Sequence, residues 1–207
     1  MTCVGQSIPL ARGHQVRGDN EPVSPADRKR ALRDFGRSQR RSRPASAESA
    51  AALADAALDR SEVSRAHTVA AYVGVGDEPD TSVLLQRLLG AGVTVLLPVV
   101  LPDLDLDWAV YEGADRLVGG PRGLLEPGGP RLGTSAVATA DVVLAPALAV
   151  DAAGRRLGQG GGCYDRALAR VPDATPVLAV VFAEEQVPGP LPQEAHDRRV
   201  DGVITAP

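Results

Sequence analysis

Aromatic residues, cysteine and lysine are all scarce in this chain of 207 residues. Aromatics make up 3% of the sequence against 44% for all hydrophobic residues, so its core must be built mainly from Ala, Val and Leu. Its two cysteines lie in no zinc-type spacing and cannot form a disulfide framework. No apolar run approaches the ~20 residues of a membrane span, and no secretory signal precedes the rest. We therefore expect a globular, cytoplasmic protein without a membrane partner.

Charge is distributed unevenly along the chain. The sequence carries 22 basic and 26 acidic residues, a net charge of −4, and Lys29 is its only lysine. Residues 1–43 hold ten of the basic residues but only four of the acidic ones, so the remainder is strongly acidic. The negative total argues against a nucleic-acid partner, and the basic segment needs an explanation of its own.

Predicted strands alternate with predicted helices over most of the sequence. Residues 1–22 lack periodicity and are interpreted as a disordered leader, which leaves 23–207 as a single α/β catalytic domain. Ser24-Pro25 is typical of a helix start. Helices are expected at 25–43, 46–60, 80–89 and 163–170, strands at 66–73, 93–100, 106–111, 141–150, 176–182 and 202–205, and mostly loop at 115–139. The alternation predicts a three-layer α/β fold, an open, Rossmann-like and mainly parallel sheet with helices on both faces.

A glycine-rich segment, 154–166, separates the most hydrophobic predicted strand from a predicted helix. Ligands of open α/β sheets bind at such junctions, and closely spaced glycines let backbone N–H groups approach an anion. Arg155, Arg156 and Arg166 can neutralise phosphate, and Asp165 can hold a divalent cation. The segment lacks the Gly-Lys-Ser/Thr end of a Walker A loop and the third glycine of the dinucleotide fingerprint. A flexible surface loop is the alternative, but the arginines favour a phosphate site.

The basic segment contains a regular stripe. Lys29, Arg33 and Arg37 stand four residues apart and therefore share one face of a predicted helix, which Arg40 and Arg41 extend. Such a face is either solvated or in contact with an anion, and a nucleotide triphosphate would suit the second possibility.

These motifs follow the same order as in one known family. The segment Arg156-Leu157-Gly158-x-Gly160-Gly161-Gly162-x-Tyr164-Asp165-Arg166 resembles the signature of the 5-formyltetrahydrofolate cyclo-ligases, also called 5,10-methenyltetrahydrofolate synthetases. The similarity covers about residues 26–205. Its other pieces are Lys29-x-x-Leu32-Arg33, Tyr72 through Thr81, Leu97-Pro98, Gly123 to Pro127, Asp141 to Asp151, Leu191-Pro192, His196-Asp197 and Val200-Asp201.

The resemblance implies a reaction and a set of ligands. It implies that the protein, which we expect to be a monomer, uses ATP and Mg²⁺ to cyclise a small-molecule substrate. That substrate would be 5-formyltetrahydrofolate, with or without a polyglutamate tail, and the product 5,10-methenyltetrahydrofolate. ADP and phosphate would be released through a phosphorylated formyl intermediate, an imidate phosphate. Lys29 and Arg156 would be catalytic, and Asp165 and Asp197 would take part in the metal site.

The resemblance also assigns two binding sets. The implied ATP-binding set is Lys29, Arg33, Arg156, Leu157, Gly158, Gln159, Gly160, Gly161, Gly162, Cys163 and Tyr164. The implied folate-binding set is Val73, Glu78, Trp108, Gly160, Gly162 and Tyr164. In this set, Glu78 would accept paired hydrogen bonds from the amino-pyrimidine edge of the pterin.

Several of these residues also have an ordinary structural interpretation. Asp165 could serve the N-terminus of a helix, Glu78 and Asp197 could be exposed turn residues, Trp108 could be ordinary core, and Tyr164 could pack the loop. The chain also departs from the family pattern at Cys163, where members often have an aromatic residue, and at Gln159, where they often have a bulky or basic one.

Two other functional classes compete with this interpretation. One is a sugar-phosphate isomerase or CoA-transferase-like enzyme, which would leave the basic stripe without a role. The other is a non-catalytic nucleotide- or folate-binding module, which would bind these ligands without turnover.

Overall fold

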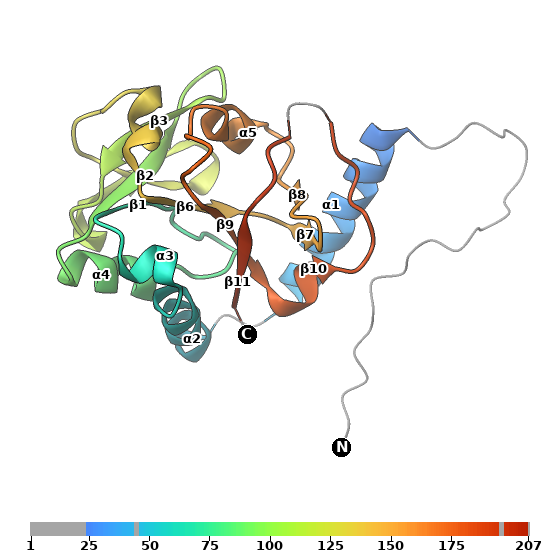
Figure 1. Cartoon of the computed structure of the whole chain (residues 1–207), viewed down its shortest axis with the longest axis horizontal. Coiled ribbons are helices and arrows are strands. Elements are labelled where there is room, and N and C mark those ends of the chain that lie inside the picture. The colour runs from blue at the N-terminus through green and yellow to red at the C-terminus, as the bar shows by residue number, and fades with distance from the viewer. Residues whose placement is uncertain (1–23, 44–45, 195–196, 207) are drawn as a thin grey trace, which may run out of the picture.

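The computed structural model describes residues 24–43, 46–194 and 197–206, so the predicted leader, 1–22, lies outside the described residues (Figure 1). The helices are α1 (Pro25–Arg41), α2 (Ala47–Leu58), α3 (Ser61–Ser64), α4 (Ser82–Gly90) and α5 (Cys163–Leu168), with 3₁₀ turns η1 (Ala114–Arg116), η2 (Pro121–Gly123), η3 (Thr134–Thr139) and η4 (Ala183–Glu185). The strands are β1 (Thr68–Ala70), β2 (Thr94–Val100), β3 (Leu106–Val110), β4 (Leu117–Gly119), β5 (Leu125–Pro127), β6 (Val142–Pro146), β7 (Ala149–Asp151), β8 (Arg156–Leu157), β9 (Val177–Phe182), β10 (Gln186–Val187) and β11 (Gly202–Ala206).

Six strands form the central sheet, in the order β11-β9-β6-β1-β2-β3. Every neighbouring pair is parallel except β2 and β3, which confirms the expected, mainly parallel sheet. The chain passes from β1 to β2 on one side, and β6 then pairs with β1 on the other side. Strand order therefore reverses at β1, and ligand crevices of open sheets lie at the carboxyl ends of the strands at such a reversal.

Two cores lie on opposite faces of this sheet. Along β6, Val142 and Leu144 join the core that contains residues of α2 and α4, whereas Val143 and Ala145 join the core that contains residues of α5. Figure 1 shows the same layers, with α2, α3 and α4 on one side of the sheet and α5 on the other. Because both of its faces are buried, β6 is a continuous apolar run without alternation.

Three local predictions need correction. The apolar run predicted as a single strand, 141–150, is divided between β6 and β7, and β7 belongs to a separate sheet of order β10-β7-β8. Pro146, which has no backbone N–H for a ladder, is the last residue of β6. The region predicted as loop, 115–139, contains the β4–β5 ladder and 3₁₀ turns. The predicted helix over 46–60 ends at Leu58 and is followed by the short α3.

Helix α1 lies beside the small sheet of β7, β8 and β10, away from the other helices (Figure 1). Ser24 caps it by accepting a hydrogen bond from the Asp27 amide, as its sequence predicts. Its two buried residues are charged, Lys29 and Arg40, and Leu32 packs against the small third core. Charged side chains therefore hold much of this helix in place.

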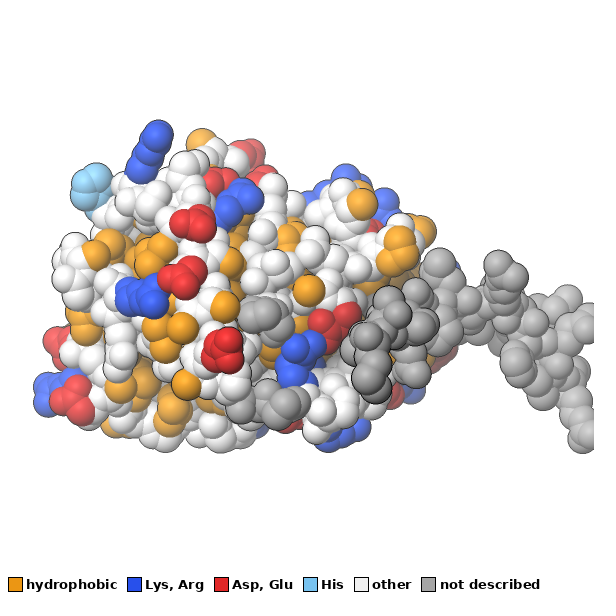
Figure 2. Space-filling model, turned by 90° about the horizontal axis from the view of Figure 1, so that it is seen from below, with side chains coloured by type: hydrophobic (Ala, Val, Ile, Leu, Met, Phe, Trp, Pro, Cys, Tyr) orange, Lys and Arg blue, Asp and Glu red, His pale blue; other side chains and the backbone are white. Residues whose placement is uncertain are grey.

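On the face in Figure 2, acidic, basic and hydrophobic side chains are interspersed. Within the described part of the chain, no helix has the length and apolar character needed to cross a bilayer.

Candidate active site

A cavity of about 780 Å³ lies at the carboxyl ends of β1, β2 and β6, where the strand order reverses. Tyr72 and Val73, which follow β1, form part of its wall together with Pro98 of β2 and Pro146 of β6. Helix α1 and the glycine segment provide the opposite, polar part of the wall. The sheet therefore contributes an apolar surface and the two sequence motifs contribute charge.

The basic face of α1 contacts the glycine segment directly. Arg33 Nε donates to the Gly158 carbonyl oxygen at 3.0 Å, and Arg37 Nη2 donates to the Gln159 carbonyl oxygen at 2.9 Å. Arg37 Nε also donates to Gln159 Oε1 at 3.1 Å. Two motifs about 120 residues apart in sequence thus form one wall, and the stripe on α1 is not simply a solvated surface.

Lys29 lies on the same wall, beside two acidic residues. Its Nζ lies 2.7 Å from Asp197 Oδ2 and 3.3 Å from Glu194 Oε1, and its side chain is only 9% exposed. All three residues line the cavity. A nearly buried ammonium group at the cavity is well placed to meet an anionic ligand, because burial strengthens its electrostatic interactions.

The glycine segment adopts a backbone that requires glycine. Gly160 has φ +103° and Gly162, the N-cap of α5, has φ +68°. A Cβ at Gly160 would lie 3.3 Å from the Arg33 guanidinium carbon. Glycine at this position therefore permits both the left-handed backbone and the close approach of α1.

Only one of the three arginines near the glycine segment lines the cavity. The buried side chain of Arg156 pairs with Asp165, and its Nε atom has no hydrogen-bond partner. Arg155 instead lies 3.5 Å from Asp151, and Arg166 donates to the Leu104 and Gly161 carbonyl oxygens. The orphaned donor of Arg156 fits an anion that enters the cavity.

Glu78 also lines the cavity and is half-buried. Its carboxylate has only long contacts, 3.5 Å to Gln159 Nε2 and 3.5 Å to the Val75 amide. Burial raises the pKa of Glu78, and the nearby positive charge of Arg40 partly opposes this rise. Most of its hydrogen-bonding capacity thus remains available to a ligand. Tyr164 and Val73 line the same cavity, as the resemblance implied.

Trp108 does not line the cavity, contrary to its expected place in the folate pocket. Its side chain has no exposed surface and packs with Val137 of η3 and Leu168 of α5. Leu106, two residues earlier on β3, reaches the cavity instead. Because η3 and α5 cover it, the tryptophan belongs to the core. Ordinary core is the alternative interpretation given for Trp108 from its sequence.

Two carboxylates stand at the cavity beside the glycine segment. Asp165 pairs with Arg156, and Asp197 pairs with Lys29. The described residues include no cluster of three or more His, Cys, Asp or Glu side chains suited to a metal. Mg²⁺ is commonly held by one or two protein carboxylates together with substrate phosphates. The donor set therefore fits Mg²⁺ that arrives with a phosphate ligand.

One cavity residue was not singled out from the sequence as part of the site, although it extends the basic stripe. Arg40 Nε donates to Glu185 Oε1 at 2.6 Å, and Arg40 Nη2 donates to Glu185 Oε2 at 2.8 Å. Arg40 also donates to the carbonyl oxygen of Ala147, just after β6. This buried pair joins α1 to the end of the central sheet. Its only sequence signal is helical spacing, since Arg40 follows Arg37 by three residues.

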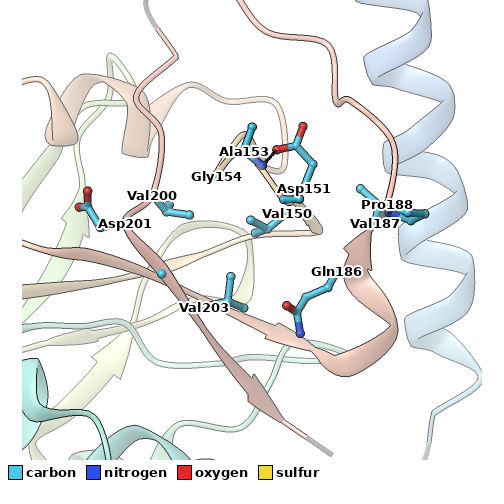
Figure 3. Close-up of a pocket in the computed structure, with 12 residues that line it drawn as sticks. Val150, Asp151, Ala153, Gly154, Gln186, Val187, Pro188, Val200, Asp201 and Val203 are labelled. Atoms are coloured by element: carbon cyan, nitrogen blue, oxygen red, sulfur yellow. Dashed lines mark hydrogen bonds between the residues drawn. The ribbon is translucent and has the colours of Figure 1, made fainter.

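A second cavity, of about 580 Å³, lies among the β7–β8 turn, β10 and the start of β11 (Figure 3). Its two carboxylates are occupied by backbone amides. Asp151 accepts from Ala153, Arg155 and Leu191 at 2.9 to 3.0 Å, and Asp201 accepts from Val177 at 2.9 Å. These carboxylates hold loops in place, so the first cavity is the candidate active site.

Known proteins are similar to this chain in sequence and in fold. The sequence model of the 5-formyltetrahydrofolate cyclo-ligase family matches residues 25–206. A 5-formyltetrahydrofolate cyclo-ligase from Mycolicibacterium smegmatis is 44% identical over 143 residues, which cover 67% of this chain and 73% of that protein. One from Escherichia coli is 37% identical over 105 residues, or 50% of this chain and 58% of that protein.

Solved structures agree with the sequence comparisons. A 5,10-methenyltetrahydrofolate synthetase from Aquifex aeolicus superposes with a TM-score of 0.71 at 26% identity, covering 86% of this chain and 89% of that one. Because the family match spans nearly all the described residues and includes every element around the cavity, the chain belongs to the 5-formyltetrahydrofolate cyclo-ligase family.

Proposed function

We propose that this protein catalyses the ATP-dependent cyclisation of 5-formyltetrahydrofolate to 5,10-methenyltetrahydrofolate, with release of ADP and phosphate. The observation that carries the proposal is the union of a basic helix face, a glycine loop and a half-buried carboxylate around one cavity. Membership of the cyclo-ligase family agrees with it. The basic and glycine-rich wall suits the polyphosphate, and the apolar wall near Glu78 suits a folate.

The reaction must convert a poor leaving group into a good one. In the proposed sequence, the formyl oxygen forms a bond to the γ-phosphorus of ATP while the bond to ADP breaks. N10 of the folate then attacks the activated formyl carbon and loses its proton, and the carbon–oxygen bond breaks to release phosphate. The protein has to hold the formyl oxygen in line with the γ-phosphate and balance the charge that develops.

The residues of the charged wall have defined roles in this proposal. Lys29 and Arg156 neutralise charge on the transferred phosphate, and Arg33 holds the glycine loop against α1 by its bond to Gly158. Residues Gly158 to Tyr164 line the cavity, and their backbone groups would surround the phosphates. Binding of the anion would draw Lys29 and Arg156 from their present carboxylate partners.

The remaining polar groups serve the metal and the folate. Asp165 and Asp197 would hold Mg²⁺, which supplies further neutralisation of phosphate charge when bound. Glu78 would accept hydrogen bonds from the pterin edge, and Val73 and Tyr164, which line the same cavity, would contact its ring. Trp108 is not included, because it lies in the core.

The direct test is to incubate the purified protein with 5-formyltetrahydrofolate, Mg²⁺ and ATP and to follow the absorbance of the methenyl product. We expect product only when ATP is present, with one ADP and one phosphate released per product formed. A folded protein that yields no product would contradict the proposal. Binding of both ligands without turnover would indicate a non-catalytic binding module instead.

A further inference from the structure

Tyr72 has a buried hydroxyl group that no hydrogen bond satisfies. The residue is 4% exposed, and its hydroxyl oxygen has no partner in the structure. A buried polar group without a partner is costly, and such groups are rare in native proteins. Tyr72 lies directly beyond β1 at the carboxyl edge of the sheet, where it lines the candidate active site.

The surroundings of this hydroxyl link it to the substrate part of the cavity. The charges of Glu78 and Arg40 and the phenol of Tyr164 all act electrostatically on Tyr72. The hydroxyl of Tyr164 is likewise buried and unpartnered. Glu78 has only its two long contacts. The two unpartnered hydroxyl groups thus belong to residues that line the same cavity as Glu78 and the apolar side chains of Val73 and Pro98.

We propose that the Tyr72 hydroxyl is a specificity-determining group for the folate substrate, and forms a hydrogen bond with the polar edge of the pterin ring beside Glu78. This inference rests on the proposed function. A pterin presents several donors and acceptors in its ring plane, so one carboxylate cannot satisfy that edge alone. A site with an unpaired polar group favours ligands that pair with it. Tyr72 acts on binding of the folate and takes no part in phosphate transfer.

Tyr72→Phe tests this role, because it removes the hydroxyl and keeps the ring. We expect the KM for 5-formyltetrahydrofolate to rise about tenfold, the size of one hydrogen bond in a desolvated site. The KM for ATP and kcat should stay within about twofold, since ground state and transition state lose the same contact. Equal folate KM values for an active wild type and its variant would overturn the inference.

Tyr111→Phe is the matched control. Tyr111 is also buried in the core that contains Tyr72, but it does not line the cavity. Loss of its hydroxyl should leave the folate KM unchanged. An equal rise in folate KM in both variants would show a general effect of removing core hydroxyls and would overturn the inference.

Thermal unfolding separates a ligand-binding hydroxyl from a structural one. Without ligand, Tyr72→Phe should unfold at a temperature no lower than the wild type, since no intramolecular bond is lost. The rise in Tm produced by 5-formyltetrahydrofolate should be smaller in the variant. A lower Tm without ligand, combined with an unchanged ligand-induced rise, would overturn the inference. A wild type that lacks turnover contradicts the proposed function, and its ligand-induced Tm shift still tests Tyr72.

Discussion

Lys29 is the side chain on which the proposed phosphate binding depends most directly. It is the only lysine of the chain, and its ammonium group is nearly buried between Asp197 and Glu194 at the cavity. In the proposed function, this ammonium group contacts a phosphate of ATP. Lys29→Ala should therefore lower kcat/KM for ATP about 10- to 100-fold, as expected for loss of a charge-assisted contact. Initial rates at varied ATP measure this effect.

Arg28→Ala is the control for Lys29→Ala. Arg28 is the preceding residue on α1, but its side chain is exposed and lies outside the cavity. Its loss should change kcat/KM for ATP by less than twofold. If Lys29→Ala behaves like Arg28→Ala, the phosphate-binding role of Lys29 is wrong.

Glu78 should make the stability of the protein depend on pH. Burial raises the pKa of its carboxyl, so the folded protein binds this proton more tightly than the unfolded chain does. Protonation of Glu78 therefore stabilises the folded protein fully at a pH below the pKa that Glu78 has in the unfolded chain. This stabilisation is lost as the pH rises through the raised pKa of Glu78 in the folded protein. Glu78→Gln should therefore unfold at a Tm equal to or above that of the wild type at neutral pH, with this advantage declining toward pH 4.

The titration of Glu78 should also affect catalysis, but here it is the ionised form that is favourable. The ionised carboxylate is the form that accepts hydrogen bonds from a pterin, so wild-type kcat/KM for the folate should fall as pH drops through the raised pKa. Glu78→Gln should have a lower kcat/KM and lack this acid limb. Glu112→Gln, at an exposed carboxylate, should retain it. An identical acid limb in Glu78→Gln would contradict the assignment.

At the scale of an element, α1 depends on the buried ion pair between Arg40 and Glu185. Both side chains are less than 10% exposed, and Glu185 Oε2 also accepts from the Phe182 amide. Removing one member of such a pair leaves the other charge buried and uncompensated. Arg40→Met should therefore lower the free energy of unfolding by about 3–5 kcal/mol, measured by denaturant titration.

A second substitution and a surface control sharpen this prediction. Adding Glu185→Gln to Arg40→Met removes the stranded charge and should recover part of the lost stability. Arg41→Met, at an exposed position of the same helix, should change stability by less than about 0.5 kcal/mol. A loss for Arg40→Met no larger than for Arg41→Met would show that the pair does not anchor α1.

These elements also show what the sequence could predict. Helical spacing placed Lys29, Arg33 and Arg37 on one face, and the glycine pattern after an apolar strand located the opposite wall of the cavity. The pairing of Arg40 with Glu185 joins residues 145 positions apart, and no local pattern encodes such a contact. The resemblance assigns Trp108 to the folate pocket and leaves ordinary core as the alternative, because a single buried aromatic in a strand pattern does not show whether core or cavity buries it. The division of β6 from β7 was missed because one apolar run supplies two sheets.

Across the whole molecule, charge is distributed unevenly, and the proposed function gives a role to its basic part. The basic residues of α1 that line the cavity, Lys29, Arg30, Arg33, Arg37 and Arg40, form one wall around the bound anion in the proposed function. The rest of the chain carries the acidic excess, part of which also lines the cavity, including Glu78, Asp165 and Asp197. On the face in Figure 2, acidic and basic side chains are interspersed. A net charge averaged over the chain therefore does not show that basic side chains gather on one wall of this cavity, where a polyphosphate would meet them.

The positions of the cavity residues in the chain predict where the catalytic unit begins. The family match covers 25–206, every residue that lines the cavity lies between Ala26 and Asp197, and the Ser24 cap begins α1. A protein that lacks residues 1–20 should therefore retain kcat/KM for both substrates within about twofold and unfold at an unchanged Tm. Deleting residues 1–41 instead removes α1, and with it the basic wall, so turnover should be lost. A more than tenfold loss from the shorter deletion would place part of the active site in the first 20 residues.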